Sequence, residues 1–321
     1  MVVTSLLGLC FLADPQVPVA RADFTFGEPQ NLGPVINTAS YEAAGSIDGL
    51  ELYLCRISPG GDNWDIWVST RRSVNDPWGP LSNLGPPVNS QYQETFLSPS
   101  SDGLTLYFSD LAPATPRPGG LGGSDIWMST RASRTAPWGT PVNVGAPINS
   151  SANDSGASLS RDGLTFVFAS DRAGGFGDFD LWMCTRPTVQ DRWGAAANLG
   201  PNVNSGYGDY CPILSPDGLV LVFCSVHRPG GLGSHDAWMT TRKSTLAPWT
   251  PAVNLGPMVN SAGADGPSGF SADMRTLYFW SERPGGFGAY DAWQVPIIPI
   301  GDFNSAGKVD ATGTRTNKKG R

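Results

Sequence analysis

Short runs of hydrophobic residues alternate with polar residues along most of the chain. Leu106 and Phe108 fall on one side of a predicted strand with Tyr107 on the other, and residues 277–279 repeat this pattern. An alternation with a period of two is typical of a half-buried β-strand, whereas an amphipathic helix repeats every 3.6 residues. The sequence has no long helical periodicity. It therefore predicts an all-β protein.

One stretch of sequence occurs five times, with a spacing of about 55 residues. An Asn-Leu-Gly element, with Val for Leu in the third copy, recurs at Asn31, Asn83, Asn143, Asn198 and Asn254. An Asp-x-Trp element recurs at Asp65, Asp125, Asp180, Asp236 and Asp291. A fixed period with four strand-like segments per unit predicts a β-propeller, whose blades bury their faces only against neighbouring blades. We expect a five-bladed β-propeller with four-stranded antiparallel blades.

The first unit illustrates the predicted blade, with strands at residues 42–47, 50–56, 65–71 and 78–84. An Asp-Gly turn joins the first two strands of a blade, because glycine supplies the positive φ that a tight hairpin needs. The fifth copy has Met274 in place of this glycine. We expect a looser turn there.

The two ends of the repeat region predict how the ring closes. Residues 26–33 match residues 78–85, so they form a fourth strand without the three strands that normally precede it. The last unit ends after Trp293 without a fourth strand. We predict that the N-terminal strand completes the last blade, which leaves no long free sheet edge in a single domain at residues 23–296.

Composition and the first residues narrow the function classes. The formal net charge of -7 and the pI near 4.8 argue against a nucleic-acid partner, since phosphate binding needs a basic surface. Residues 1–22 are predicted to be a signal peptide, because a short apolar run is followed by the small-x-small site Ala20-Arg21-Ala22. No further apolar run is long enough to span a membrane. We expect a monomer that is secreted, periplasmic or on the cell surface.

Three motifs carry a resemblance to a known family: Ser215-Pro216-Asp217-Gly218, the loop at 283–288 and Asp291-Ala292-Trp293. They resemble the WD-like propeller repeat of TolB-type periplasmic and surface proteins. The resemblance covers nearly all of the predicted mature chain. It implies a β-propeller in an exported protein, often with a binding or scaffolding role, and no single chemistry.

An acid stands in the same register at the start of the first strand of every unit: Glu42, Glu94, Asp154, Asp209 and Asp265. In a propeller this strand lines the central channel, so the five carboxylates form a predicted ring. Two interpretations remain open. Each acid pairs with loop amides or an arginine, as a buried charge requires. Alternatively, the ring holds a cation or a polar ligand on the axis.

Glycine-rich loops follow the second strands, with an arginine before them (Arg117, Arg172, Arg228 and Arg283) and the Asp-x-Trp aspartate after them. None precedes a helix or carries a P-loop lysine, so a phosphate site is not predicted. We expect each arginine to pair with the aspartate of its own loop and clamp it.

Residues that break the repeat are the better functional candidates, because packing requires the repeated ones in every blade. The loops place such residues at Trp64, Phe179, His235, Trp280 and Tyr290, together with His227 and an insertion at 112–116. Aromatic rings beside carboxylates are the combination that binds sugars. Ordinary loop variation is the alternative explanation. Two histidines without a third nearby ligand do not make a zinc site.

Four cysteines follow the predicted signal peptide, namely Cys55, Cys184, Cys211 and Cys224. A two-residue turn would place Cys211 opposite Cys224, whereas a bulged three-residue turn favoured by Pro216 would separate them. Both arrangements stay open at this point. We expect Cys55 and Cys184 to be free and buried.

The tail at 297–321 changes character and is expected to be disordered. It resembles the first half of a dockerin calcium loop, with Asp302, Asn304 and Asp310 at ligand positions. Ala306 and Gly313 stand where oxygen ligands belong, so calcium binding is in doubt. No other cofactor is predicted.

Three classes of function are consistent with the sequence. We expect a non-catalytic binding or scaffold module for a glycan or a protein surface, which uses the loop face. The alternative is a carbohydrate-active enzyme, a glycoside hydrolase or lyase that uses channel carboxylates. A uniform ring argues against the enzyme, because catalysis needs an acid and a base in different environments. A structural module that binds nothing is the third class.

Overall fold

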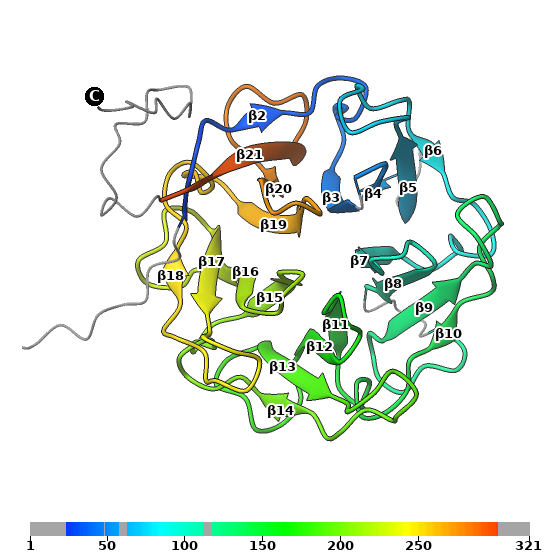
Figure 1. Ribbon diagram of the computed structural model, residues 1–321, viewed down its shortest axis with the longest axis vertical. Helices are drawn as coiled ribbons and strands as arrows, with labels where there is room; N and C mark the ends of the chain where they lie inside the picture. Colours follow the sequence, from blue (N-terminus) through cyan, green and yellow to red (C-terminus); the bar gives the residue numbers. More distant parts are fainter. Residues whose placement is uncertain (1–23, 48, 58–62, 112–116, 301–321) are drawn as a thin grey trace, which may run out of the picture.

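Five antiparallel sheets stand in a ring around one axis, and the predicted five-bladed β-propeller is confirmed (Figure 1). The computed structural model describes residues 24–47, 49–57, 63–111 and 117–300, without the side chains of 43–47. The predicted signal peptide and the calcium-loop residues Asp302, Asn304 and Asp310 lie outside the described residues. Strands β3, β7, β11, β15 and β19 are the innermost in their blades.

Each blade follows the chain from the axis outward, because consecutive antiparallel strands are joined by short turns. The first blade contains β3 (Glu42–Ile47), β4 (Glu51–Ile57), β5 (Trp64–Thr70) and β6 (Ser82–Asn83). The second contains β7 (Glu94–Pro99), β8 (Thr105–Asp110), β9 (Ile126–Thr130) and β10 (Val142–Asn143). The third contains β11 (Asp154–Leu159), β12 (Thr165–Ser170), β13 (Asp180–Thr185) and β14 (Ala197–Asn198). The fourth contains β15 (Asp209–Leu214), β16 (Val220–Val226), β17 (His235–Thr241) and β18 (Val253–Asn254).

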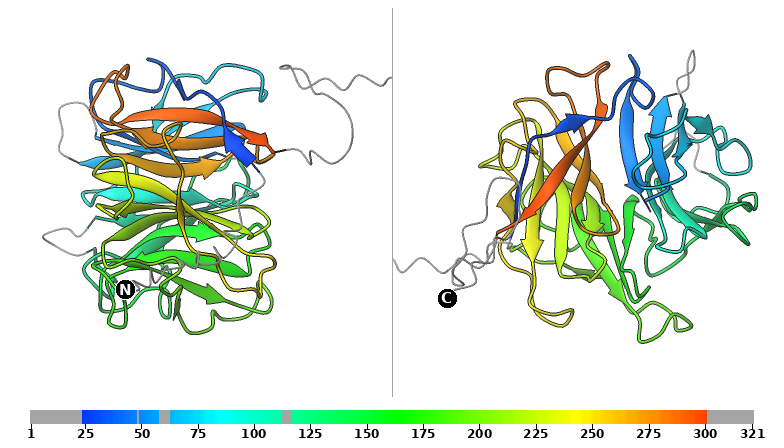
Figure 2. Two further views of the ribbon diagram at one scale, coloured as in Figure 1. Left: turned by 90° about the vertical axis from the view of Figure 1, so that its left-hand side faces the viewer. Right: turned by 45° about the horizontal axis from the view of Figure 1, so that its top comes forward.

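The fifth blade joins the two ends of the ring, as predicted. It contains β19 (Asp265–Phe270), β20 (Thr276–Ser281), β21 (Asp291–Pro299) and the N-terminal strands β1 (Phe24–Phe26) and β2 (Gln30–Asn31). Both N-terminal strands pair with β21, and Figure 2 shows them lying along it. A side-chain bond of 2.8 Å from Asn31 Nδ2 to Asp291 Oδ2 also links the ends. The ring is therefore closed by sheet pairing rather than by a covalent link.

The hydrophobic core lies between neighbouring blades rather than within one blade. Leu54 of the first blade packs in one cluster with Tyr278 and Ala292 of the fifth. Phe223 of the fourth blade packs with Val167 of the third. Each such side chain contributes about 1.5–3 kcal/mol when fully buried. The blades thus stabilise one another, as the repeat predicted.

Every inner strand carries a β-bulge just after its acid, where its register against the next strand shifts. Gly156 takes a positive φ of 60° at this place, but Phe96 at 49° and Cys211 at 50° are not glycines. A left-handed residue with a side chain is strained, and such strain is often found at functional sites. These bulges redirect side chains toward the axis.

Two local expectations are settled by the hairpins of these inner strands. Met274 adopts a φ of 57°, and its N–H donates to Ser271 O at 2.9 Å, as Gly218 does to Ser215 at 2.8 Å. The expected looser turn is therefore wrong. The bulge in β15 places Tyr210 opposite Cys224. All four cysteines in the described residues are free.

Candidate functional site

The five ring acids are fully buried at the first position of the inner strands. Each carboxylate accepts hydrogen bonds from the main-chain N–H and the hydroxyl of the Ser or Thr four residues earlier. The pairs are Thr38 with Glu42, Ser90 with Glu94, Ser150 with Asp154, Ser205 with Asp209 and Ser261 with Asp265. The loop that precedes each inner strand thus holds the acid at the start of that strand.

An arginine of the same blade reaches each ring acid. Arg172 Nη2 lies 2.6 Å from Asp154 Oδ1, and its guanidinium stacks 5.4 Å from the ring of Trp182. The other pairs are Arg56 with Glu42, Arg117 with Glu94, Arg228 with Asp209 and Arg283 with Asp265. The tryptophan of the Asp-x-Trp element therefore covers an ion pair in every blade. This geometry supports the interpretation in which the ring acids are paired within the protein.

The expected clamp between these arginines and the Asp-x-Trp aspartates is wrong. Asp180 instead accepts hydrogen bonds from the N–H groups of Phe176 and Gly177 and from Asn198 Nδ2. The glycine-rich loop folds back so that its own amides point at the aspartate. The arginine is then left for the acid of the inner strand.

The fourth blade departs from this pattern because it has one additional residue, His227, before its arginine. In the fifth blade Arg283 follows Ser281 by two residues and donates from Nε to Ser281 Oγ at 2.9 Å. His227 adopts a left-handed φ of 52° and displaces Arg228 along the loop. Arg228 Nη1 donates to Val203 O at 2.7 Å. Its distance to Asp209 Oδ1 is 3.6 Å, too long for a hydrogen bond.

Asp209 Oδ1 and Ser225 Oγ are among the buried polar atoms of the described residues that lack a well-formed hydrogen bond. The two residues are cross-strand partners, so these atoms face each other. No oxygen of the other four ring acids is among those atoms. Burial raises the pKa of Asp209, against the hydrogen bonds from Ser225 and Ser205 and the charge of Arg228. Asp209 Oδ1 is thus held less tightly than the oxygens of the other ring acids.

A cavity of about 420 Å³ opens on the loop face at the axis. We call this cavity the loop-side pocket. Residues of the first, second, fourth and fifth blades line it: Cys55, Trp64, Thr95, Phe96, Leu111, Tyr210, Cys211, Cys224, Val226, His235, Trp280 and Tyr290. Asp209 does not line the pocket, but its chain neighbour Tyr210 does. The pocket is therefore the candidate site.

A continuous row of rings borders this pocket, and we call it the aromatic arc. It consists of Trp64, Tyr41, Tyr290, Trp280 and His235 in that order. Successive ring centroids are 6.1, 5.2, 5.0 and 6.0 Å apart. Rings at these separations hold one another in tilted and edge-on contacts. The arc thus joins loops of the first, fourth and fifth blades into one apolar wall.

Most of the predicted loop-face residues meet in this pocket. Trp64, His235, Trp280 and Tyr290 line it directly. Phe179 does not line it but supports Tyr210 from outside, with ring centroids 4.8 Å apart. The insertion at 112–116 lies outside the described residues.

Sequence reasoning missed the residues that form the inner pocket. Phe96 and Cys211 occupy the strained bulge positions, which no sequence alternation marks as facing the axis. Tyr210 directly follows a ring acid in β15. The one usable signal was the additional residue His227, which interrupts the spacing between strand and arginine.

The three thiols in the pocket are not metal ligands. Burial raises the pKa of Cys55 and of Cys211 to about 12 and raises that of Cys224 as well, so the thiols stay neutral. Among the described residues, no group of three His, Cys, Asp or Glu side chains could hold a metal ion.

The rim of the pocket carries one exposed carboxylate, Glu282. It accepts a hydrogen bond from the N–H of Ala264 at 3.0 Å and lies beside Tyr290 and His235. Burial lowers the pKa of His235, and the nearby His227 lowers it further, so the ring is kept neutral. A carboxylate therefore stands at the open end of the aromatic arc.

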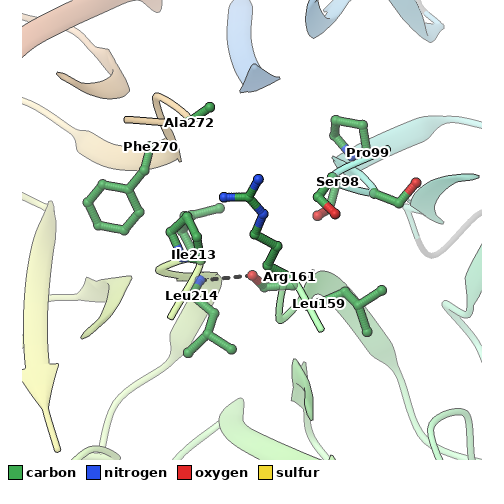
Figure 3. Close-up of a pocket in the computed structure, with 12 residues that line it drawn as sticks. Ser98, Pro99, Leu159, Arg161, Ile213, Leu214, Phe270 and Ala272 are labelled. Carbon is green, nitrogen blue, oxygen red and sulfur yellow. Dashed lines mark hydrogen bonds between the residues drawn. The ribbon is translucent and has the colours of Figure 1, made fainter. Parts of the chain in front are cut away.

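The opposite mouth of the ring is smaller and different in character. A cavity of about 130 Å³ lies among the hairpin turns, and Figure 3 shows Arg161 extending into it between Ile213 and Ser98. Ser158 Oγ accepts a hydrogen bond from Leu214 N–H at 2.8 Å in its wall. Its lining contains a single aromatic ring, that of Phe270. The loop side is therefore the better candidate for binding a larger ligand.

No family model matches the sequence, and no curated protein matches it. Solved structures do share the fold. One is an endo-arabinase from Bacteroides thetaiotaomicron VPI-5482, with a TM-score of 0.52 and 13% identity over 88% of this chain and 98% of that chain. Another is an alpha-L-arabinofuranosidase from Lactobacillus brevis, with a TM-score of 0.50 and 12% identity over 88% and 94% of the two chains.

A TolB structure from Agrobacterium tumefaciens is also similar, with a TM-score of 0.44 and 16% identity over 81% of this chain and 77% of that chain. At these identities the similarities show the propeller fold. The dockerin-like tail has no support in these comparisons. Within the described residues, no helix is long and apolar enough to cross a membrane.

The comparisons correct the expected function. We expected a non-catalytic binding or scaffold module, but structures that share the fold with a TM-score of at least 0.50 are described as an endo-arabinase, an alpha-L-arabinofuranosidase and a putative glycoside hydrolase. They favour the alternative, a carbohydrate-active enzyme. The sequence argument against that alternative assumed five equivalent acids, and the structure shows that Asp209 differs from the rest.

Proposed function

We propose that the protein is a carbohydrate-active enzyme that cleaves glycosidic bonds, with the sugar bound at the loop-side pocket. The observation that carries the proposal is the loop-side pocket itself, where the rings of Trp280 and Tyr290 stand beside the carboxylate of Glu282. Secretion, as predicted from the sequence, would bring the enzyme to extracellular glycans.

The aromatic arc supplies the sugar-binding surface. Sugars present apolar C–H faces that stack on tryptophan and tyrosine rings, while their hydroxyls seek carboxylates and imidazoles. Trp280 and Tyr290 offer the rings, and Glu282 and His235 stand beside them at the rim. This combination supports a glycan as the ligand.

Glycoside cleavage needs two carboxyl groups in different environments. A protonated carboxyl gives its proton to the leaving oxygen, and a carboxylate activates water or attacks the sugar carbon. Asp209 suits the first role, because burial raises its pKa and its Oδ1 lacks the 2.6 Å arginine contact that Asp154 has. Glu282 suits the second role, because it is exposed to water at the rim.

The test is an activity screen of the full chain on soluble glycans and on chromogenic glycosides. Arabinan and arabinofuranosides belong in the panel because an endo-arabinase and an arabinofuranosidase share the fold. We expect Asp209→Asn and Glu282→Gln each to lower kcat at least 100-fold, the usual size of a general acid or base contribution of about 10²–10⁴.

Asp154→Asn is the matched control for Asp209→Asn. Asp154 is equally buried in the neighbouring blade, but both of its oxygens are hydrogen-bonded. The Asp154→Asn variant should be less stable than the wild type but should keep the wild-type kcat per folded molecule. Equal losses of kcat in both variants, or no turnover of any glycoside by the wild type, would contradict the proposal.

A further inference from the structure

The inner wall of the loop-side pocket is too apolar to bind a bare sugar alone. Below the aromatic arc it is lined by Phe96, Leu111, Tyr210, Val226 and the three thiols. No lysine, arginine or carboxylate is among the described lining residues. Hydroxyl groups placed against such a wall would lose their hydrogen bonds to water without replacement.

Two of the polar side chains that reach the wall are engaged within the protein. Thr95 Oγ1 donates to Ser109 O at 3.3 Å, and His235 Nδ1 lies 3.1 Å from Ser234 Oγ. The thiols are kept neutral by burial, so they behave as small apolar groups. The inner wall therefore selects an apolar ligand group.

The cavity has room for such a group beside a sugar. An apolar cavity of about 150 Å³ is already large enough to take up benzene. The loop-side pocket measures about 420 Å³. One aromatic ring would fill only part of it.

The rings that face the cavity favour a flat ligand over an aliphatic one. Trp280 and Tyr210 stand on adjacent blades, and Phe96 enters from the second blade. A flat ring can make offset or edge-on contacts with all three, each worth more than its buried area alone. An aliphatic ring of the same size would gain only the free energy of burying its apolar surface.

We propose that the inner pocket takes an aromatic group attached to the sugar, such as a phenolic aglycone or a phenolic ester on a glycan. The proposal rests on the function proposed above and names the substrate class for the same site. The aromatic arc would hold the sugar at the rim, and the inner wall would hold the aromatic group. The substrate is then an aryl glycoside or a phenol-bearing glycan rather than an undecorated one.

Titration calorimetry of the full-length protein with phenol, cyclohexanol and arabinose tests the inner pocket without requiring turnover. We expect phenol to bind about three- to tenfold more tightly than cyclohexanol, the value of one aromatic pair. Arabinose alone should bind more weakly than phenol. Trp280→Ala should weaken phenol binding by a similar factor. Phe287→Ala, an exposed ring outside the pocket, should leave it unchanged.

Val226→Phe provides a second variant if Trp280→Ala fails to fold, because it fills the cavity and should abolish phenol binding. Equal affinity for phenol and cyclohexanol would overturn the proposal, as would phenol binding that neither variant changes. Cleavage of undecorated glycans at the same kcat/KM as aryl glycosides would also overturn it while sparing the proposed function. Phenol binding at this pocket without cleavage of any glycoside would support the aromatic pocket and reject the proposed function.

Discussion

The indole ring of Trp280 lies over Gly266, so close that a Cβ on this glycine would come within 2.3 Å of the ring. The two residues are cross-strand partners in the fifth blade. At the equivalent pair of the fourth blade the large residue is on the other strand, where Tyr210 faces Cys224. These two blades thus each pair one large residue with one small residue, and both rings reach the loop-side pocket.

Gly266→Ala should displace Trp280 from its place in the pocket. The added methyl group meets the indole at a distance that no real side chain tolerates, so the ring must move or the strand must shift. We expect a loss of about 1–3 kcal/mol of folding free energy, the usual cost of overpacking. Urea denaturation measures it, and near-UV circular dichroism reports the ring. The same change at Gly206, where no atom lies within 4 Å of the added Cβ, is the control. An unchanged spectrum in the Gly266 variant would contradict the placement of Trp280.

Asp154→Asn should be strongly destabilising. The variant leaves the partly buried Arg172 without its charged partner at 2.6 Å. Breaking one side of a buried ion pair costs roughly 3–5 kcal/mol. Arg72→Gln is the control, because its pair with Asp76 is exposed and contributes about 0–1 kcal/mol. Equal denaturation midpoints for the two variants would show that the ring pairs do not stabilise the fold.

The raised pKa of Asp209 predicts a pH dependence of stability. Between the ordinary aspartate value of 3.8 and the raised native value, the folded protein keeps a proton that the unfolded chain has lost. Stability should therefore fall as pH rises through this window. The pKa values of Glu42, Glu94, Asp110 and Asp125 are raised as well, so Asp209→Asn should reduce that slope, not abolish it, in denaturation measured over the window.

Asp102 supplies a control of the opposite sign. The hydroxyl of Ser100 and the N–H of Leu104 lower the pKa of Asp102. Its contribution to stability is present above the ordinary value and is lost as pH falls through the lowered one. Asp102→Asn should remove that loss at low pH. A steeper fall in stability for Asp209→Asn than for the wild type would refute the assignment to Asp209.

Removal of β1 and β2 should open the ring. A chain that begins at Pro34 lacks the pairing with β21 and the packing of Phe24 and Phe26 on the core. We expect a loss of more than about 2 kcal/mol, given the value of buried apolar side chains. The exposed edge of β21 should also promote association. Urea denaturation and size-exclusion chromatography test both effects against a chain that begins at Asp23. A truncated monomer with an unchanged midpoint would mean that the N-terminal strands are not part of the closure.

The architecture was readable from the sequence because it follows from local rules. Alternation with a period of two predicted the strands, and the spacing of the Asp-x-Trp elements predicted the blades. The unmatched strand at 26–33 predicted the closure onto β21, which the pairing of Asn31 with Trp293 confirms. The same pattern occurs in five copies, so the structure predicted for one copy is supported by the other four.

The candidate site was readable only in part. Trp64, His235, Trp280 and Tyr290 were found because they break the repeat in loops of one face. Phe96 and Cys211 were not found, because a bulge with positive φ turns them toward the axis against the alternation of their strands. Whether an arginine pairs with the inner acid or with the loop aspartate also has no sequence signal, since both acids lie nearby along the chain.

The sequence by itself determined the number of blades, their strands and the closure of the ring, because hydrophobic periodicity and turn residues act over a few neighbouring positions. Only the tertiary structure decided which charges pair and which remain free. That choice depends on how the loops of a blade fold back onto its own inner strand. In the fourth blade, which has the additional residue His227, Arg228 Nη1 lies 3.6 Å from Asp209 Oδ1, whereas Arg172 Nη2 lies 2.6 Å from Asp154 Oδ1 in the third. Distances of this kind are set by contacts between segments that local sequence rules do not relate.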